Sequence, residues 1–412
     1  MKLAKRGLAL GALGAVLSLS GCGGSAVAGL DSAPPELASV RLLPPPEVDP
    51  AELQVLFWDD AKRTQRFREM EKWFAGHEVP AASTTLPLAK GEPLPDVLVA
   101  DIRKTMADTN AAGVMVWHKG TVRFEGYGLE FGPEQRWTSF SVAKSFTSTL
   151  LGAAIADGFI GSLEDPVTQY IPQLAGSSYD GVTVKQLATM TSGVAWDEDY
   201  SDPESDVAQM NRFVLEYGPN AIVEQMKRLS RESEPGTQFN YKTGETNLIG
   251  LLVENAVGLP LAEYAQEKIV EPAGFENGLF WMVDPRGGNI GGCCLSLSLA
   301  DYTRMGVFVL GGGKGADGTA TVPEGWFGQA GAAQVKFGGG FGYGYQWWTY
   351  PQGNFGGQGI FGQAITIIPE SDLVIARVSN WPTATSSKFG EDWLKLAYRI
   401  AAADGQPVAS NQ

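Results

Sequence analysis

The chain has 412 residues, of which 44% are hydrophobic and 19% are charged, and its formal net charge is −15. This length allows one large two-lobed domain or two ordinary ones, and the composition is typical of a folded globular protein. The negative charge argues against nucleic acid or an anionic membrane surface as a partner. Only two histidines, His77 and His118, are present. That count excludes a histidine-rich metal site, and no organic cofactor is implied.

Residues 1–21 are predicted to be a signal peptide. A basic start, residues 2–6, precedes an apolar stretch, residues 7–19, that is too short to span a bilayer as an ordinary helix. Leu19-Ser20-Gly21-Cys22 resembles the bacterial lipoprotein cleavage box, in which the cysteine becomes the lipidated first residue. We expect Cys22 to anchor the protein in the bacterial cell envelope, facing the periplasm from the outer membrane of a Gram-negative host. The alternatives are a plain secretory peptide with an incidental cysteine, or a short anchor.

Residues 22–50 are predicted to be a flexible tether, because turn-forming residues are frequent there and large apolar residues are few. Residues 51–412 are predicted to form one folded domain. The other two cysteines, Cys293 and Cys294, are adjacent. Neighbours in sequence rarely bridge each other, so we expect no structural disulfide and two small buried side chains.

Within the domain, strands are predicted at both ends and helices in the middle. The first strands form a hairpin over residues 112–127 with its turn at 118–120, and later strands cover 344–350, 364–369 and 373–379. Residues 161–284 are mainly helical by period, and a last helix covers 391–402. The pattern predicts an α/β (α+β) fold in which both ends of the chain build one antiparallel sheet and a helical lobe is inserted between them.

The strongest chemical signal is Ser141-Val142-Ala143-Lys144 at the start of a predicted helix, residues 141–156. Side chains at i and i+3 share a helix face, so the Lys144 amine can reach the Ser141 hydroxyl. The free N–H groups of the first helical turn favour developing negative charge, and a desolvated lysine can act as a base. These are the parts of an activated serine nucleophile. The alternative is a serine that caps the helix and a solvated lysine.

Two later segments support the first reading. Tyr241 lies in a loop before an apolar helix that begins near Leu248, and a tyrosine held near a lysine ammonium can have a depressed pKa and relay protons. A glycine-rich segment, residues 356–363, then leads into a strand, and its glycines let a substrate lie close to the backbone. A tyrosine that only packs in the core is the alternative for Tyr241.

Ser-x-x-Lys, then Tyr, then a glycine-rich strand is the order found in the penicillin-recognising serine hydrolases. With Met190-Thr191-Ser192-Gly193 and Tyr200-Ser201-Asp202-Pro203, residues 51–402 resemble the β-lactamase-related serine hydrolases, which include class C β-lactamases and penicillin-binding proteins. They are most similar to the branch of 6-aminohexanoate-dimer hydrolases and esterases. The resemblance implies the serine β-lactamase/DD-peptidase fold, with an active site between the lobes. It also implies an acyl-enzyme on Ser141 with Lys144 and Tyr241 as the proton relay.

The resemblance also implies further site residues. The oxyanion would lie between the backbone N–H groups of Ser141 and Ile360, and Gly359 would face the substrate. Thr243 stands where the superfamily usually has asparagine, and its hydroxyl would contact substrate or support Lys144. Tyr200 matches a substrate-binding tyrosine of the 6-aminohexanoate-dimer branch. It lies in an acidic run, residues 196–202, that is either a cleft lip suited to a free amine or a solvated loop.

Strand alternation sends Tyr345 and Trp347 to one face and Trp348 to the other. Trp347 is predicted to line the pocket, with core packing as the alternative.

The glycine-rich motif departs from the family pattern, because Gly357-Gln358-Gly359 stands where Lys-Thr-Gly or His-Thr-Gly is usual. The cation that helps to bind a β-lactam carboxylate is therefore missing, although another cation nearby can substitute. We predict a serine hydrolase that acts on a small-molecule ester or amide, with no protein partner evident. The alternatives are a β-lactamase or DD-peptidase-like enzyme and a catalytically silent envelope lipoprotein that binds a ligand.

Overall fold

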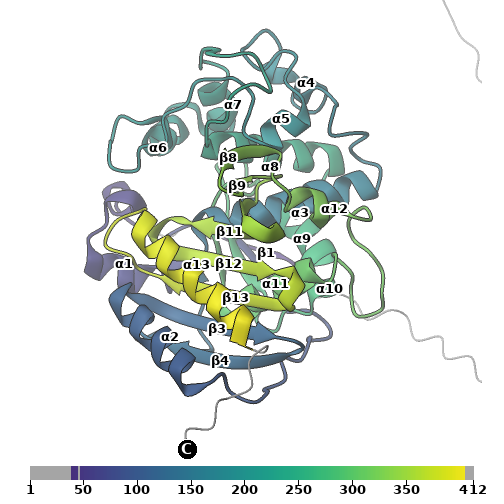
Figure 1. Cartoon of the computed structure of the whole chain (residues 1–412). Coiled ribbons are helices and arrows are strands. Elements are labelled where there is room, and N and C mark those ends of the chain that lie inside the picture. Colours follow the sequence, from purple (N-terminus) through teal and green to yellow (C-terminus); the bar gives the residue numbers. More distant parts are fainter. Residues whose placement is uncertain (1–38, 45–46, 404–412) are drawn as a thin grey trace, which may run out of the picture. The chain divides into compact units, whose positions relative to one another are not determined.

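Both ends of the described chain contribute to one antiparallel sheet of eight strands (Figure 1). The computed structural model describes residues 39–44 and 47–403, so the predicted signal peptide, Cys22 and most of the tether lie outside the described residues. The strand order is β4-β3-β13-β12-β11-β10-β9-β8. The strands are β3 (Ala111–His118), β4 (Thr121–Tyr127), β8 (Val335–Gly338), β9 (Phe341–Tyr343), β10 (Trp348–Tyr350), β11 (Asn354–Gly359), β12 (Gln363–Ile368) and β13 (Leu373–Ser379). The predicted hairpin and the strands predicted over 364–369 and 373–379 are confirmed, whereas of the strand predicted over 344–350 only residues 348–350 form a strand, β10.

Helices cover both faces of this sheet. On one face lie α2 (Asp96–Asp108) and α13 (Ser387–Ala402), which pack on each other over the apolar side chains of β3 and β13. On the other face lie α11 (Leu299–Leu310) and α3 (Ala143–Ala156). Alternate residues of the central strands belong to different core clusters, as the period of a strand requires when both faces are covered.

A second, five-stranded sheet was not predicted. Its order is β1-β2-β6-β7-β5, and its strands are β1 (Arg41–Leu43), β2 (Gly76–Val79), β5 (Trp137–Thr138), β6 (Leu279–Met282) and β7 (Leu295–Leu297). The tether prediction is wrong over β1, because residues 41–43 pair with β2 instead of forming a free linker. The backbone bonds of this short strand are satisfied by a partner more than thirty positions away, which local composition does not reveal.

The middle of the chain is helical, as predicted. Its helices are α4 (Val167–Tyr170), α5 (Val184–Ala188), α6 (Asp206–Tyr217), α7 (Ala221–Met226), α8 (Thr243–Val257), α9 (Leu261–Ala265) and α10 (Glu271–Ala273). The lobe ends earlier than the predicted residue 284, because β6 already belongs to the second sheet. Two short helices, α1 (Asp60–Arg66) and α12 (Trp326–Ala330), lie outside this region.

Helices α3 and α8 pack against each other and are apolar on nearly all sides, which is typical of buried helices. Strand β11 approaches α3 closely at Gly357, where a Cβ atom would lie 2.9 Å from the Ser145 hydroxyl. The glycine therefore lets strand β11 lie against the helix that begins with the Ser-x-x-Lys turn. Within the described residues, no single helix is long and apolar enough to cross a membrane; only the bent pair formed by α8 and residues 261–273 reaches that length and composition together.

The prediction that Cys293 forms no disulfide is wrong, because the structure bonds it to Cys294. In a strand the two side chains would point to opposite faces, but residues 291–294 form a turn and bend that precede β7. The turn therefore lets both sulfur atoms lie on one side of the backbone.

Candidate active site

Ser141 lies in a 3₁₀ turn, Phe140–Val142, that leads directly into α3. The residue before it, Phe140, has a φ of 42°, a left-handed conformation that a bulky side chain rarely adopts. Its ring packs against Phe67 at 5.0 Å and against Phe361 at 5.5 Å between centroids. This aromatic packing offsets the backbone strain that presents Ser141 at the helix start.

The Lys144 amine is held by three hydrogen bonds. Its Nζ atom donates to Ser141 Oγ at 3.2 Å, to Thr243 Oγ1 at 3.0 Å and to the Gly292 carbonyl at 2.8 Å. The side chain is buried at 1% exposure. Two of the three bonds position the nitrogen, and the third points it at the serine hydroxyl. The predicted support of Lys144 by the Thr243 hydroxyl is confirmed.

Burial lowers the pKa of Lys144 to about 8, and the nearby negative charge of Glu198 opposes part of that change. The neutral amine is therefore accessible near neutral pH, where an ordinary lysine is almost fully protonated. A neutral Lys144 can accept the Ser141 proton.

Tyr241 completes the cluster but differs from the prediction in its titration. Burial first, and then Glu198, raise the pKa of Tyr241, although a hydrogen bond with Ser141 lowers it in part. The expected depression of its pKa is therefore wrong, because desolvation and a carboxylate outweigh the ammonium, whose nitrogen lies 5.2 Å from the centre of the tyrosine ring. Tyr241 stays a neutral hydroxyl, which can donate or pass on a proton but does not act as a phenolate.

A carboxylate that the sequence analysis missed, Glu198, lies beside these groups. It accepts a hydrogen bond from the Thr243 backbone N–H at 2.9 Å, from the Tyr200 hydroxyl at 2.9 Å, and also from the Thr243 hydroxyl and the Trp196 indole. Because Thr243 is the first residue of α8, the carboxylate also lies at the positive end of that helix. Glu198, Thr243, Lys144 and Ser141 thus form one continuous hydrogen-bonded chain.

The alternation of buried and exposed residues in the acidic run, residues 196–202, could have indicated that Glu198 faces the site. Trp196, Glu198 and Tyr200 are buried or half-buried, whereas Asp197 and Asp199 between them are exposed. Asp197 and Asp199 accept backbone N–H bonds from residues two positions later, as turn-forming residues do. The reading as a solvated, turn-forming loop therefore holds for Asp197 and Asp199, whereas the suitability of the run for a substrate amine stays a prediction.

The predicted oxyanion position lies where β11 ends against the nucleophile turn. A Cβ atom on Gly359 would lie 2.4 Å from the Ser139 carbonyl and 3.1 Å from the Ser141 nitrogen, so only glycine permits this approach. Ile360 follows at once and lines the same pocket as Ser141. After it, Phe361 again has a positive φ, of 58°, and packs against Phe140.

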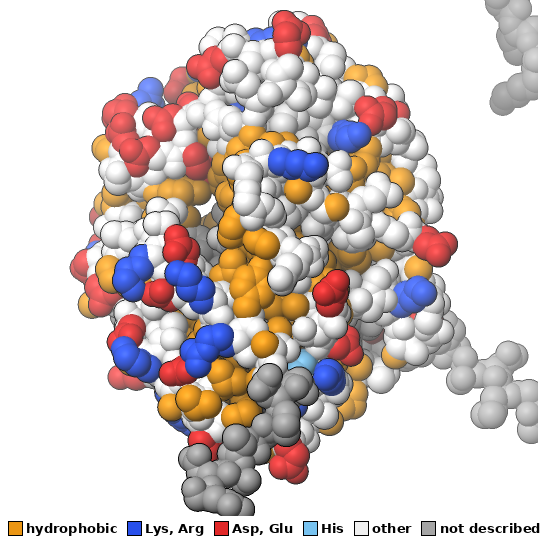
Figure 2. All heavy atoms as spheres, viewed as in Figure 1, with side chains coloured by type: hydrophobic (Ala, Val, Ile, Leu, Met, Phe, Trp, Pro, Cys, Tyr) orange, Lys and Arg blue, Asp and Glu red, His pale blue; other side chains and the backbone are white. Residues whose placement is uncertain are grey.

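A cavity of about 660 Å³ opens in front of Ser141, and we call it the front pocket. Of the predicted binding residues, Tyr200 and Gly359 line it, whereas Thr243 does not. Its aromatic wall comes from Phe337, Phe341 and Trp348, the last of which stacks on Tyr241 with ring centres 5.6 Å apart. Phe337 and Phe341 are 46% and 43% exposed on the β8–β9 hairpin, on a face where hydrophobic side chains gather (Figure 2).

The prediction that Trp347 lines the pocket is wrong. Trp347 is fully buried, with its ring against Phe327 of α12 and Phe355 of β11. Tyr345 and Trp347 are both buried, as the core-packing alternative predicts, but they lie in the irregular segment between β9 and β10, so strand alternation is not what places them in the core. The neighbouring Trp348 lines the pocket instead.

At the third motif, Gln358 donates a hydrogen bond to the Tyr350 hydroxyl at 2.7 Å. A cation does line the front pocket, but it comes from β13. Arg377 donates from Nε to the Gly362 carbonyl at 2.8 Å and lies over the rings of Trp381 and Trp393. Burial lowers its pKa to about 9. A charged residue within an otherwise apolar strand is the feature of the sequence by which Arg377 could have been found.

No group of three or more His, Cys, Asp or Glu side chains that could hold a metal ion occurs in residues 39–44 and 47–403. The side chains gathered at Ser141 can themselves perform nucleophilic attack and proton transfer. An antiparallel sheet, a pair of buried helices and a Ser-x-x-Lys turn at a helix start define the serine hydrolases of β-lactamase fold.

The chain belongs to the Beta-lactamase family, which it matches over residues 98–399. It is 30% identical over 299 residues to a 6-aminohexanoate-dimer hydrolase of Paenarthrobacter ureafaciens, with 68% of this chain and 76% of that protein covered. A solved structure from Bacillus anthracis, named for the same activity, superposes with a TM-score of 0.76 at 22% identity and covers 84% of this chain and 95% of that one. A class C β-lactamase superposes with a TM-score of 0.57 at 17% identity, covering 75% of this chain and 96% of the other.

Proposed function

We propose that the protein hydrolyses a carboxylic ester or amide through a covalent acyl-enzyme on Ser141. The observation that carries this proposal is the buried Lys144 amine, 3.2 Å from Ser141 Oγ and with its pKa lowered to about 8. A base that is partly neutral at physiological pH and within reach of a serine hydroxyl is what an activated nucleophile requires.

The reaction proceeds in two steps. Neutral Lys144 takes the Ser141 proton as the oxygen attacks the substrate carbonyl, and the negative charge on the carbonyl oxygen faces the N–H groups of Ser141 and Ile360. Each such donor contributes about 3 kcal/mol to the lowering of the barrier. Tyr241 then gives its hydroxyl proton to the leaving group as the Lys144 ammonium returns a proton to Tyr241, so that both groups regain their starting states. A water molecule, deprotonated by the same pair, then releases the acyl group.

The test is hydrolysis of 4-nitrophenyl acetate, 4-nitrophenyl butyrate and the 6-aminohexanoate dimer by the wild-type chain and by Ser141→Ala. Turnover of any of these that disappears in Ser141→Ala supports the proposal, and mass spectrometry should detect the acyl-enzyme on the Ser141 peptide. Ser230→Ala, at an exposed serine outside the pocket, is the control that should keep full activity. Turnover retained by Ser141→Ala would contradict the mechanism.

A second candidate, β-lactam acylation, is favoured by Arg377. It is 7% exposed, lines the front pocket and has no carboxylate partner among the described residues. It is therefore available to a substrate carboxylate in place of the missing motif cation. Nitrocefin hydrolysis that is lost in both Ser141→Ala and Arg377→Gln would support this candidate, and nitrocefin left intact by the wild type would exclude it.

The place of the enzyme in the cell envelope, through a lipid on Cys22, stays part of the proposal. Its support is the sequence pattern around Leu19-Ser20-Gly21-Cys22. Palmitate labelling in a bacterial host should mark the wild type and fail with Cys22→Ser. Equal labelling of both would contradict the anchor.

A further inference from the structure

Ser141 also lines a second cavity, which lies on the side away from the β8–β9 hairpin. This connecting cavity, of about 140 Å³, contains Ser141, Tyr200 and Ile360 in its wall, all three of which also line the front pocket. Tyr241, by contrast, lines only the front pocket. The nucleophile therefore stands between two spaces of different chemistry.

The connecting cavity adjoins a larger one of about 610 Å³, which we call the deep cavity. Six residues line both, namely Leu53, Gln54, Phe74, Met210, Met282 and Ile290. The deep cavity is bounded by residues 42–43 and 50–54, by α6 and α7, and by the loop 282–290. Because these six side chains border both cavities, the deep cavity lies directly beside the space next to Ser141.

The walls of these cavities are mainly apolar, and several of their polar side chains are already paired, whereas the side chain of Gln54 is exposed. The connecting cavity has no charged side chain in its wall. In the deep cavity, Arg286 is bound by Asp284 and Glu254, Asn247 accepts the Gly292 N–H, and Gln225 donates to the Asp206 carbonyl. These polar groups need no bond from a ligand, whereas the aliphatic, methionine and phenylalanine side chains offer surface for apolar burial.

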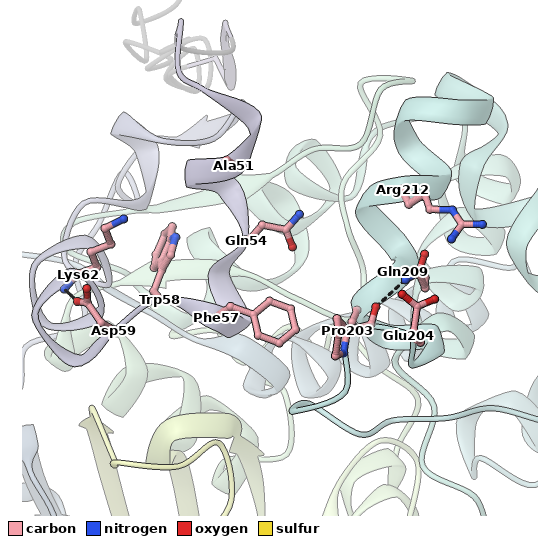
Figure 3. A pocket seen from close by; sticks show the side chains of 11 residues that line it. Ala51, Gln54, Phe57, Trp58, Asp59, Lys62, Pro203, Glu204, Gln209 and Arg212 are labelled. Carbon is pink, nitrogen blue, oxygen red and sulfur yellow. Dashed lines mark hydrogen bonds between the residues drawn. The ribbon is translucent and has the colours of Figure 1, made fainter.

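The connecting cavity also adjoins an opening between residues 50–62 and the start of α6. There a cavity of about 660 Å³ shares Gln54, Phe57 and Ala208 with the connecting cavity. Figure 3 shows Gln54 and Phe57 directed across this opening toward Pro203 and Gln209. A flexible chain thus has a route of entry other than the front pocket.

The direction of proton transfer determines which part of a substrate lies beside which cavity, because the leaving group must receive a proton. This step rests on the proposed function. The leaving group needs a proton from Tyr241, which faces only the front pocket. The leaving group therefore lies in the front pocket, and the acyl group extends to the other side of Ser141. We propose that the connecting and deep cavities bind the acyl chain, and that the substrates are esters or amides of linear, uncharged, medium-length fatty acids.

The first measurement is kcat/KM of the full chain on 4-nitrophenyl esters from acetate to octanoate. We expect a rise of up to about fourfold for each added methylene, the factor that corresponds to the burial of one such group. Met210→Trp, or Leu53→Trp from the opposite wall, should block the passage and lower the octanoate-to-acetate ratio by about tenfold or more, because even two methylenes lose their contacts. The control, Glu216→Trp, places the same side chain on an exposed position of α6 that lines no cavity and should leave the ratio unchanged.

A binding measurement separates this inference from the proposed function. Calorimetry on Ser141→Ala should show that octanamide, which is uncharged, binds at least about 100-fold more tightly than acetamide. Octanamide has six more methylenes than acetamide, and burial of fewer than six supplies that factor. The Met210→Trp change in the same background should remove that difference. Ester hydrolysis that is lost in Ser141→Ala but is independent of chain length would overturn the acyl-chain site and leave the proposed function standing. Equal binding of octanamide and acetamide would also overturn it, whether or not the enzyme cleaves any ester.

Discussion

The groups that hold the Lys144 amine beside Ser141 and the walls that face a substrate come from different kinds of structural element. Lys144 and Thr243 sit at the starts of two packed, buried helices, and every bond that holds the lysine nitrogen comes from a buried or half-buried group. Part of the wall that faces a substrate comes instead from irregular or edge segments, such as the β8–β9 hairpin and residues 50–57, although Arg377 of the central strand β13 also lines the front pocket. Reactivity is thus set by rigid elements, and substrate choice by elements that can change without disturbing the core.

The largest effect is expected within the rigid part, from Lys144→Met. Replacing the amine by an uncharged chain of similar length removes the base and should lower kcat/KM by about 10⁴-fold, the upper end of what a general base supplies. Steady-state hydrolysis of 4-nitrophenyl butyrate measures this, with circular dichroism to check the fold. Lys185→Met, at an exposed lysine paired with Glu164, is the control and should stay active. A Lys144→Met variant within tenfold of wild type would remove Lys144 from the mechanism.

Tyr241→Phe should have the next largest effect. It keeps the ring that stacks on Trp348 and removes only the hydroxyl, so we expect a loss of about 10³-fold in kcat. Tyr343→Phe offers a matched control, because Tyr343 is buried beside Tyr241 but does not line the front pocket. If both variants lost the same activity, the effect of Tyr241 would be one of packing rather than proton transfer.

The comparison also explains what sequence could predict. The helix over residues 141–156 and the Ser141–Lys144 contact follow from local pattern, because helix geometry fixes which residues share a face. Glu198 joins the same cluster through a loop, and β2 pairs with β1 more than thirty positions away and with β6 about two hundred positions away, so neither feature follows from local periodicity. The Trp347 error has the same origin, since Trp347 lies in the irregular segment between β9 and β10, where strand alternation does not apply.

The pH dependence tests whether burial controls the base. Because burial lowers the pKa of Lys144 to about 8 and only the neutral amine accepts a proton, kcat/KM should rise as the pH increases through that value. A single group with this pKa predicts activity about 100-fold below the plateau at pH 6. An amide or stable ester substrate should be used, so that spontaneous hydrolysis at high pH does not obscure the profile. An activity independent of pH between 6 and 9 would contradict the role of Lys144 as base.

Glu198→Gln sharpens this test by removing the negative charge that raises the pKa of Lys144. The midpoint of the pH profile should therefore move to lower pH. The plateau should fall by about tenfold, because the bonds from Thr243 would no longer end on a charged acceptor. Asp199→Asn alters an exposed carboxylate next to Glu198 in the sequence, and it should leave the midpoint in place. A shift to higher pH in Glu198→Gln would contradict the electrostatic argument.

The smallest effect on activity, and the sharpest contrast, is expected at two adjacent tryptophans. Trp348→Ala removes a pocket wall that stacks on Tyr241 and should raise KM by about fivefold, in line with about 1 kcal/mol for such an aromatic contact. Trp347→Ala instead opens a cavity between α12 and β11 and should lower the free energy of unfolding by about 3–5 kcal/mol. Denaturant titration and substrate kinetics on both variants separate the two roles. If Trp348→Ala lost as much stability as Trp347→Ala, the pocket wall would be part of the core, and the division between rigid chemistry and adaptable walls would fail there.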